Sequence, residues 1–158
     1  MPLLLGVGNP WRGDDGIGPA VAGRVARLGI PELEVAVETE PLALLVHLEG
    51  QSTVVVVDAT TPGPNPGRVR VWRIGSDRLV RRGQVIGSHG LGVGDAVELA
   101  RSLGRLPPEL TLVGVEARSS RLGDGLSGPV HERLDDAVQA VLHEFAKLPR
   151  RCSPFDQS

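Results

Sequence analysis

Cysteine is almost absent from this sequence, in which Cys152 is the only one among 158 residues. A single cysteine excludes a disulfide framework and any metal cluster built from several thiolates. A reducing cytoplasm is the compartment that fits this composition best. Aromatic residues make up 3% of the chain and tyrosine is missing altogether. This scarcity argues against an aromatic platform for single-stranded nucleic acid.

Long apolar runs and an excess of one charge are also missing. No run approaches the roughly 20 apolar residues that a membrane-spanning helix needs. The first ten residues, MPLLLGVGNP, lack the basic region of a signal peptide. The formal net charge is −2, which gives no electrostatic footprint for nucleic acid or for an anionic membrane. We therefore expect no nucleic-acid partner and no membrane partner.

Hydrophobic patterning predicts strands that alternate with helices along the chain. The expected strands span residues 3–7, 33–37, 53–58, 69–74 and 110–116. The expected helices span residues 16–28, 41–48, 91–103 and 130–148. This order is typical of an α/β fold with a mostly parallel sheet covered on both faces. We expect one domain over residues 1–148 and a disordered tail over 149–158.

Two of the expected strands differ in their pattern of apolar residues. The run at residues 54–57 is four consecutive valines, which is typical of a central strand buried on both faces. Residues 69–74 alternate between apolar and polar, as an edge strand with one wet face does. The sheet is therefore expected to be parallel at its centre, with one antiparallel strand at its edge.

Acidic residues follow the ends of the expected parallel strands. Because these ends meet at one edge of the sheet, the side chains are expected to converge there. The residues concerned are Asp14 and Asp15, Glu38, Asp58 and Glu116, and a later loop with Ser88 and His89 can reach the same edge. Several carboxylates with one imidazole and no thiolate suit a borderline divalent ion such as nickel or zinc.

Simpler interpretations exist for each of these groups. One carboxylate of Asp14 and Asp15 is expected to be structural, because acids in a first helical turn commonly cap it. Asp58 is harder to assign to a purely structural role, because it ends an apolar strand where an ionised group is costly to bury without a partner. His89 lies in a glycine-rich loop, where solvent exposure is the simpler interpretation. Glu38 and Glu116 fit supporting or capping roles better than ligand roles, so composition alone leaves the site open.

The same segments resemble those of the hydrogenase maturation proteases, the endopeptidases that trim the C-terminus of the [NiFe]-hydrogenase large subunit. The resemblance spans residues 3 to about 148 and rests on an ordered set of motifs. These motifs are GVGNPWRGDDGIG (6–18), VVVVDA (54–59), SHGL (88–91), LVGVE (112–116) and GLS (125–127). The first motif is fairly specific, and the ordered set is more specific than any one member.

The resemblance implies a three-layer α/β fold and a monomeric, metal-dependent endopeptidase of the aspartic type. It carries the family's catalytic and metal-facing residues onto Asp15, Asp58 and His89. It also implies that no metal is permanently bound, because nickel already inserted in the large-subunit precursor serves as the recognition element. Water would be the attacking group, activated either by the metal or by one carboxylate acting as general base.

Two features depart from the family pattern. Where many members carry an Asp-Gly-Gly-Thr-like segment linked to substrate selection, residues 38–41 read ETEP. Trp11 stands where leucine is common. It is interpreted either as a contact for a substrate tail or as a buried structural tryptophan. The class of hydrogenase that is processed therefore stays open.

Two other functions remain compatible with the sequence. The first is a chaperone or binding module that holds the nickel-bearing subunit without cutting it. The second is a small-molecule metallohydrolase on the same fold. Tight stoichiometric binding of metal by the isolated chain would favour the metallohydrolase.

Overall fold

The computed structural model describes residues 1–74 and 92–148. Its strands are β1 (Leu3–Val7), β2 (Glu34–Glu38), β3 (Thr53–Thr60), β4 (Val69–Ile74) and β5 (Glu109–Glu116). Its helices are α1 (Ile17–Arg27), α2 (Leu44–Leu48), α3 (Val93–Ser102), α4 (Gly128–Glu132) and α5 (Leu134–Ala146). Two short 3₁₀ turns, η1 (Gly13–Gly16) and η2 (Pro41–Ala43), precede α1 and α2.

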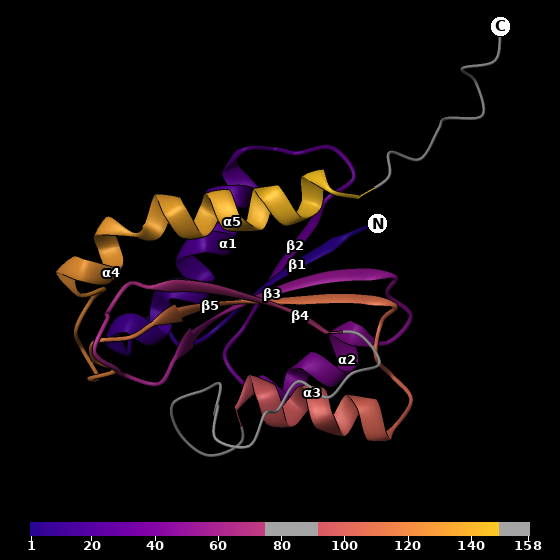
Figure 1. Ribbon diagram of the computed structural model, residues 1–158, viewed down its shortest axis with the longest axis horizontal. Coiled ribbons are helices and arrows are strands. Elements are labelled where there is room, and N and C mark those ends of the chain that lie inside the picture. Colours follow the sequence, from indigo (N-terminus) through magenta and orange to yellow (C-terminus); the bar gives the residue numbers. More distant parts are fainter. Residues whose placement is uncertain (75–91, 149–158) are drawn as a thin grey trace, which may run out of the picture.

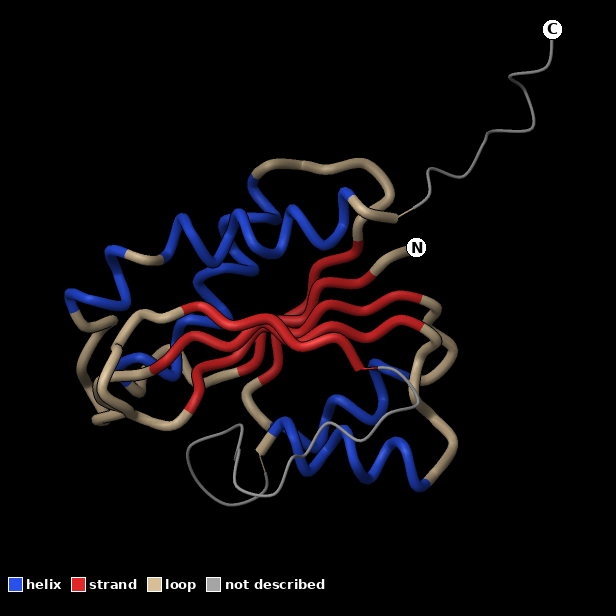
Figure 2. Tube along the Cα trace, viewed as in Figure 1, coloured by secondary structure: helices blue, strands red, loops and turns tan. Residues whose placement is uncertain are grey.

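The strands form one mixed sheet in the order β2-β1-β3-β5-β4. The four strands β2, β1, β3 and β5 are parallel, and β4 pairs with β5 in the antiparallel direction. Helices α1 and α5 cover one face of this sheet, and α2 and α3 cover the other (Figures 1 and 2). The expected three-layer α/β fold with one antiparallel edge strand is confirmed.

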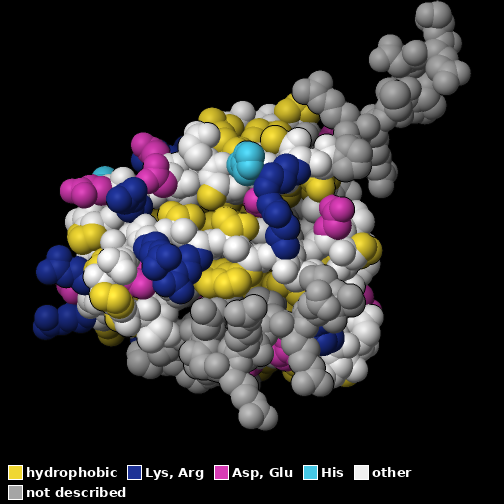
Figure 3. Space-filling view, in the orientation of Figure 1, with side chains coloured by type: hydrophobic (Ala, Val, Ile, Leu, Met, Phe, Trp, Pro, Cys, Tyr) yellow, Lys and Arg dark blue, Asp and Glu magenta, His cyan; other side chains and the backbone are white. Residues whose placement is uncertain are grey.

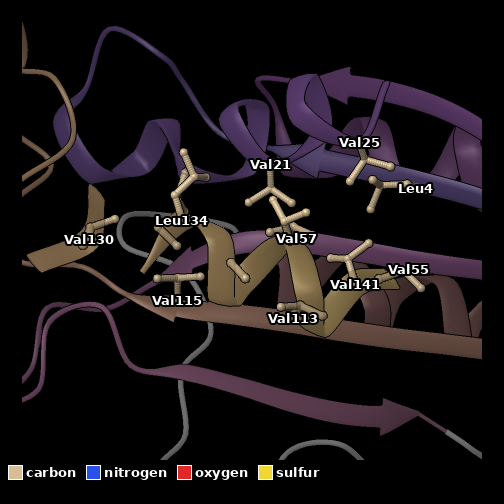
Figure 4. Close-up of a cluster of buried hydrophobic side chains, with 14 of the residues drawn as sticks. Leu4, Val21, Val25, Val55, Val57, Val113, Val115, Val130, Leu134 and Val141 are labelled. Carbon is tan, nitrogen blue, oxygen red and sulfur yellow. The ribbon is translucent and has the colours of Figure 1, made fainter. Parts of the chain in front are cut away.

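The central strand β3 shows how the valine run builds two separate cores. Val54 and Val56 pack on the side of α2 and α3, whereas Val55 and Val57 pack on the side of α1 and α5. This follows from the alternation of side chains between the two faces of a strand. Figure 4 shows the second core, in which Val55 and Val57 lie among apolar side chains of α1, β5 and α5. Both faces of β3 are therefore covered by apolar side chains along the valine run.

Several boundaries differ from those expected, and three of the differences stand out. Strand β3 continues to Thr60, because Asp58, Ala59 and Thr60 stay in register with β5. The expected helix over 16–28 begins instead as the 3₁₀ turn η1 and becomes α-helical only at Ile17. The single closing helix expected over 130–148 is wrong: the chain breaks between α4 and α5 at Arg133, whose backbone leaves the α-helical region.

The expected tail over residues 149–158 lies outside the described residues. None of the helices in the described ranges is both long and apolar enough to cross a membrane.

Candidate active site

The loop between β1 and α1 is held close to the sheet by glycines. A Cβ atom on Gly18 would lie 2.2 Å from the backbone oxygen of Val7 and 2.6 Å from that of Val57. Only glycine allows the start of α1 to approach β1 and β3 so closely. Gly8 has a φ of 141°, and a Cβ there would overlap the backbone oxygen of Asp15. The glycine-rich motif therefore fixes Asp15 at the carboxyl edge of the sheet.

Asp14 is fully buried and its carboxylate is saturated with hydrogen bonds. Its Oδ2 accepts bonds from the backbone N–H groups of Arg118 and Ser119 at 2.7 and 3.0 Å. The Ser127 hydroxyl donates to the same oxygen at 2.8 Å, and the Ser127 N–H donates to Oδ1 at 2.7 Å. Four donors satisfy this buried charge. Asp14 is thus the structural member of the acidic pair, and it ties the first loop to the segment that follows β5.

Asp15 has a different environment, although it is the next residue in the chain. Its carboxylate is partly exposed and accepts one bond from the backbone N–H of Asn9 at 2.8 Å. The N–H of Trp11 in turn donates to the Asn9 side-chain oxygen at 2.9 Å. Asp15 therefore keeps acceptor positions that a ligand can use.

Asp58 is the carboxylate that interacts electrostatically with Asp15. It follows the valine run of β3, and only 6% of its surface is exposed. Burial raises the pKa of the Asp58 carboxyl well above its ordinary value, and the negative charge of Asp15 raises it further. A hydrogen bond from the Ala59 N–H lowers this pKa in part. The two carboxylates together disfavour a second negative charge and favour a proton or a cation between them.

The third predicted site residue, His89, lies outside the described residues. The structure therefore brings together two of the three expected groups, Asp15 and Asp58. Among the residues it describes, no group of three or more potential ligands of the histidine, cysteine, aspartate and glutamate types gathers in one place. The oxygen donors present suit a divalent cation, and His89 stays a predicted member of the site.

The other two acids at this edge have structural partners. The Oε1 of Glu38 lies 2.7 Å from the Nε2 of His47, which connects the end of β2 to α2. The Glu116 carboxylate accepts a hydrogen bond from the Asn65 N–H and thereby holds the loop before β4. These contacts agree with the supporting roles that their positions in the sequence favour.

Trp11 is not buried. Its side chain is 74% exposed, which rules out the interpretation as a buried structural tryptophan. Ser127 is the residue at this edge that sequence reasoning missed as a partner of Asp14. A separation of 113 positions leaves no local signal that would connect the two residues.

The structure thus defines a three-layer α/β protein with a pair of interacting carboxylates at the carboxyl edge of its parallel sheet. Over residues 37–144 the chain matches the family model described as hydrogenase maturation protease, and it belongs to this family.

Individual relatives agree with this assignment. The hydrogenase expression/formation protein HupD of Bradyrhizobium diazoefficiens is 28% identical over 164 residues, which cover 99% of this chain and 85% of that protein. The hydrogenase 2 maturation protease of Escherichia coli is 28% identical over 144 residues, which cover 89% of this chain and 87% of that protein. The solved structure of the hydrogenase maturating endopeptidase HybD from E. coli superimposes with a TM-score of 0.73 at 25% identity, and the match covers 92% of each chain.

Proposed function

We propose that this protein is an endopeptidase that removes the C-terminal extension of a [NiFe]-hydrogenase large-subunit precursor after nickel has been inserted. The observation that carries the proposal is the electrostatic interaction of Asp15 with the buried Asp58 in a chain of this family. The nickel is part of the substrate, and the protein itself holds no permanent metal. Asp15, Asp58 and His89 are the residues proposed to contact the substrate's nickel and the peptide next to it.

The electrostatics of the carboxylate pair support a nickel checkpoint. Burial and the charge of Asp15 both oppose ionisation of Asp58. A cation brought by the substrate would relieve that repulsion, so the pair favours a nickel-loaded precursor over an empty one. A precursor without nickel offers no such compensation. Discrimination between the two forms thus follows from the charge of the site.

The proposed cleavage uses water as the attacking group. Asp15 is the more exposed carboxylate and has acceptor positions free to orient a water molecule or take its proton. Asp58, whose pKa is raised by burial and by Asp15, is suited to donate a proton to the leaving nitrogen. These assignments make the reaction of the aspartic type, with the substrate's nickel as the recognition element.

The test is a cleavage assay read by intact mass. The purified chain is mixed with nickel-loaded and with nickel-free large-subunit precursor from the same source. We expect loss of one defined C-terminal peptide from the nickel-loaded form alone. Asp15→Asn, Asp58→Asn and His89→Ala should each abolish cleavage but leave binding measurable. Glu132→Gln, which changes an exposed carboxylate on α4, is the matched control and should cleave normally.

Each alternative function predicts a different result in this assay. A chaperone would bind the nickel-loaded precursor with no loss of mass. A small-molecule metallohydrolase would bind divalent metal tightly and stoichiometrically in the absence of precursor. Cleavage of the nickel-free form would contradict the requirement for nickel in the precursor but would still support the protease activity. We further propose that the protein acts as a monomer, as the family resemblance implies, and that it acts in the cytoplasm, a compartment that the single cysteine favours.

A further inference from the structure

Trp11 is an exposed aromatic side chain on a firmly held backbone. The Trp11 N–H donates to the Asn9 side chain at 2.9 Å, and the Trp11 carbonyl accepts a bond from the Gly123 N–H at 2.8 Å. The next residue, Arg12, forms an isolated antiparallel bridge with Leu122. Trp11 and Leu122 are 74% and 69% exposed. Large apolar side chains held in place and left in water are typical of a binding surface.

A groove of about 320 Å³ lies beside this loop. It is lined mainly by apolar residues and by two glycines: Pro10, Gly13, Gly16, Pro19, Ala20 and Leu126. Gly16 and Pro10 pack closely together, since a Cβ on Gly16 would lie 3.1 Å from the Cα of Pro10. A groove of this volume accepts an apolar side chain.

The two segments joined by the Arg12–Leu122 bridge carry mainly positive exposed charges. Arg12, Arg118 and Arg121 are exposed on the two segments that the bridge joins, and Asp124 is the exposed acid on them. None of these three arginines forms a salt bridge within the described part of the chain. The whole chain has a formal net charge of −2, so the positive charge of these segments is opposite in sign to that of the chain as a whole. In Figure 3, arginine side chains project at the left end of the view, where Figure 1 labels α4, and acidic side chains lie above them.

This surface adjoins the candidate active site. Asn9, which binds Asp15 through its N–H, binds Trp11 through its side chain. Asp14 ties the segment of Arg118 and Ser127 to the same loop. A peptide held on this surface would therefore enter the site past Asp15.

We propose that Trp11, Leu122, the groove and the three arginines form a docking surface for an acidic segment of the large-subunit precursor that also carries an apolar side chain. The apolar side chain would fill the groove beside Trp11, and its neighbouring carboxylates would pair with the arginines. This proposal rests on the proposed function, because it names the same substrate protein. It assigns binding, and no chemical step, to these residues.

The test measures the Kd for nickel-loaded precursor and the single-turnover cleavage rate for each variant. Trp11→Ala is expected to raise Kd about tenfold or more. The combined variant Arg12→Glu, Arg118→Glu, Arg121→Glu should raise Kd by at least as much and flatten its dependence on salt. At saturating precursor, the cleavage rate of each variant should stay within about twofold of the unmodified protein, because Asp15 and Asp58 are unchanged.

Matched controls come from the other end of α1, at the opposite edge of the sheet. Leu28→Ala removes an apolar side chain that is 57% exposed, and Arg27→Glu reverses an exposed charge. Both controls should leave Kd unchanged. Circular dichroism of every variant shows whether a changed Kd reflects lost fold.

The outcomes separate the two proposals. Normal Kd values in Trp11→Ala and in the arginine variant would contradict the docking surface but would not affect the proposed protease activity. Binding without cleavage by the unmodified protein overturns the protease, and the Kd values of the variants then still decide the docking surface. Neither binding nor cleavage overturns both. Self-association that Trp11→Ala abolishes, with a normal Kd for precursor, assigns the surface to a second copy of the chain and overturns the proposal.

Discussion

Asp14 and Asp15 are neighbours in the chain, yet the structure surrounds their carboxylates in opposite ways. Asp14 is fully buried and accepts four hydrogen bonds from Arg118, Ser119 and Ser127. Asp15 is partly exposed, accepts one backbone hydrogen bond and interacts electrostatically with a second carboxylate, Asp58. The comparison shows that residue type does not separate an acid with a full set of hydrogen bonds from one with free acceptor positions. The number of donors around each carboxylate does.

The largest expected effect comes from removing the saturated carboxylate. Asp14→Ala should lower the free energy of unfolding by about 3–5 kcal/mol, because it leaves buried donors without an acceptor. Urea unfolding followed by circular dichroism measures this change. Asp15→Asn is the paired control and should stay within about 1 kcal/mol of the unmodified protein. Equal losses of unfolding free energy in the two variants would show that the hydrogen bonds of Asp14 do not make it more important for stability than Asp15.

The next effect comes from the pH dependence of Asp58. Its pKa is raised in the folded state, so the folded protein keeps a proton that the unfolded chain releases near its ordinary value of 3.8. The stability supplied by this proton is fully present below that value and is lost as the pH rises through the raised folded pKa. The loss has a slope of up to about 1.4 kcal/mol per pH unit.

Asp58→Asn removes this group from the titration. Urea unfolding of both proteins, compared between about pH 4 and 8, isolates its contribution from that of all other groups. The unmodified protein should lose stability relative to the variant as the pH rises. Parallel pH profiles would show that Asp58 is not held protonated, and the contrast with Asp14 would then rest on geometry alone.

The smallest effect concerns a paired carboxylate near the surface. Glu144 accepts hydrogen bonds from Arg73 at 3.2 and 3.3 Å and from Lys147 at 3.1 Å. Desolvation opposes its ionisation, but these cationic donors outweigh that effect and lower its pKa from the ordinary value of 4.5. The resulting stability is present above that value and is lost as the pH falls through the lowered one.

Glu144→Gln should cost about 0.3–1 kcal/mol near neutral pH, and less at high salt. Thermal unfolding at low and high salt measures both quantities. Glu132→Gln, on an exposed part of α4, serves as the control and should change neither. If Glu144→Gln lowered the free energy of unfolding as much as Asp14→Ala, ion pairing would contribute as much to stability as burial with several hydrogen-bond donors.

Much of the fold could be predicted from local patterns. Four consecutive valines require a strand with two dry faces, and the structure places them at the centre of the sheet. The break at Arg133 could not be predicted, because no proline or glycine interrupts the apolar spacing from Val130 to Val141. The extension of β3 to Thr60 was hidden by the turn-rich residues after it. Pairing of Thr60 with Glu116 of β5 decides that boundary.

The candidate site was predictable in part, because sheet topology determines where the strand ends lie. Parallel strands bring their ends to one edge, which is why Asp15 and Asp58 could be expected to meet. Which of Asp14 and Asp15 is buried depends on a segment more than 100 residues away, and no local pattern contains that information. The exposure of Trp11 likewise depends on what covers it, so the sequence left two interpretations and the structure decided between them.

The hydrogen bonds of Asp14 also constrain how the protein is made on the ribosome. The donors lie 104 to 113 positions after Asp14, so the first loop is synthesised long before its partners. Strand β1 can pair with β2 and β3 while the nascent chain is still short, because these strands lie in its first 60 residues. The acidic loop reaches its final hydrogen bonding only after Ser127 has left the ribosome. A nascent chain that stops before that residue would carry an assembled half-sheet with an unfinished first loop.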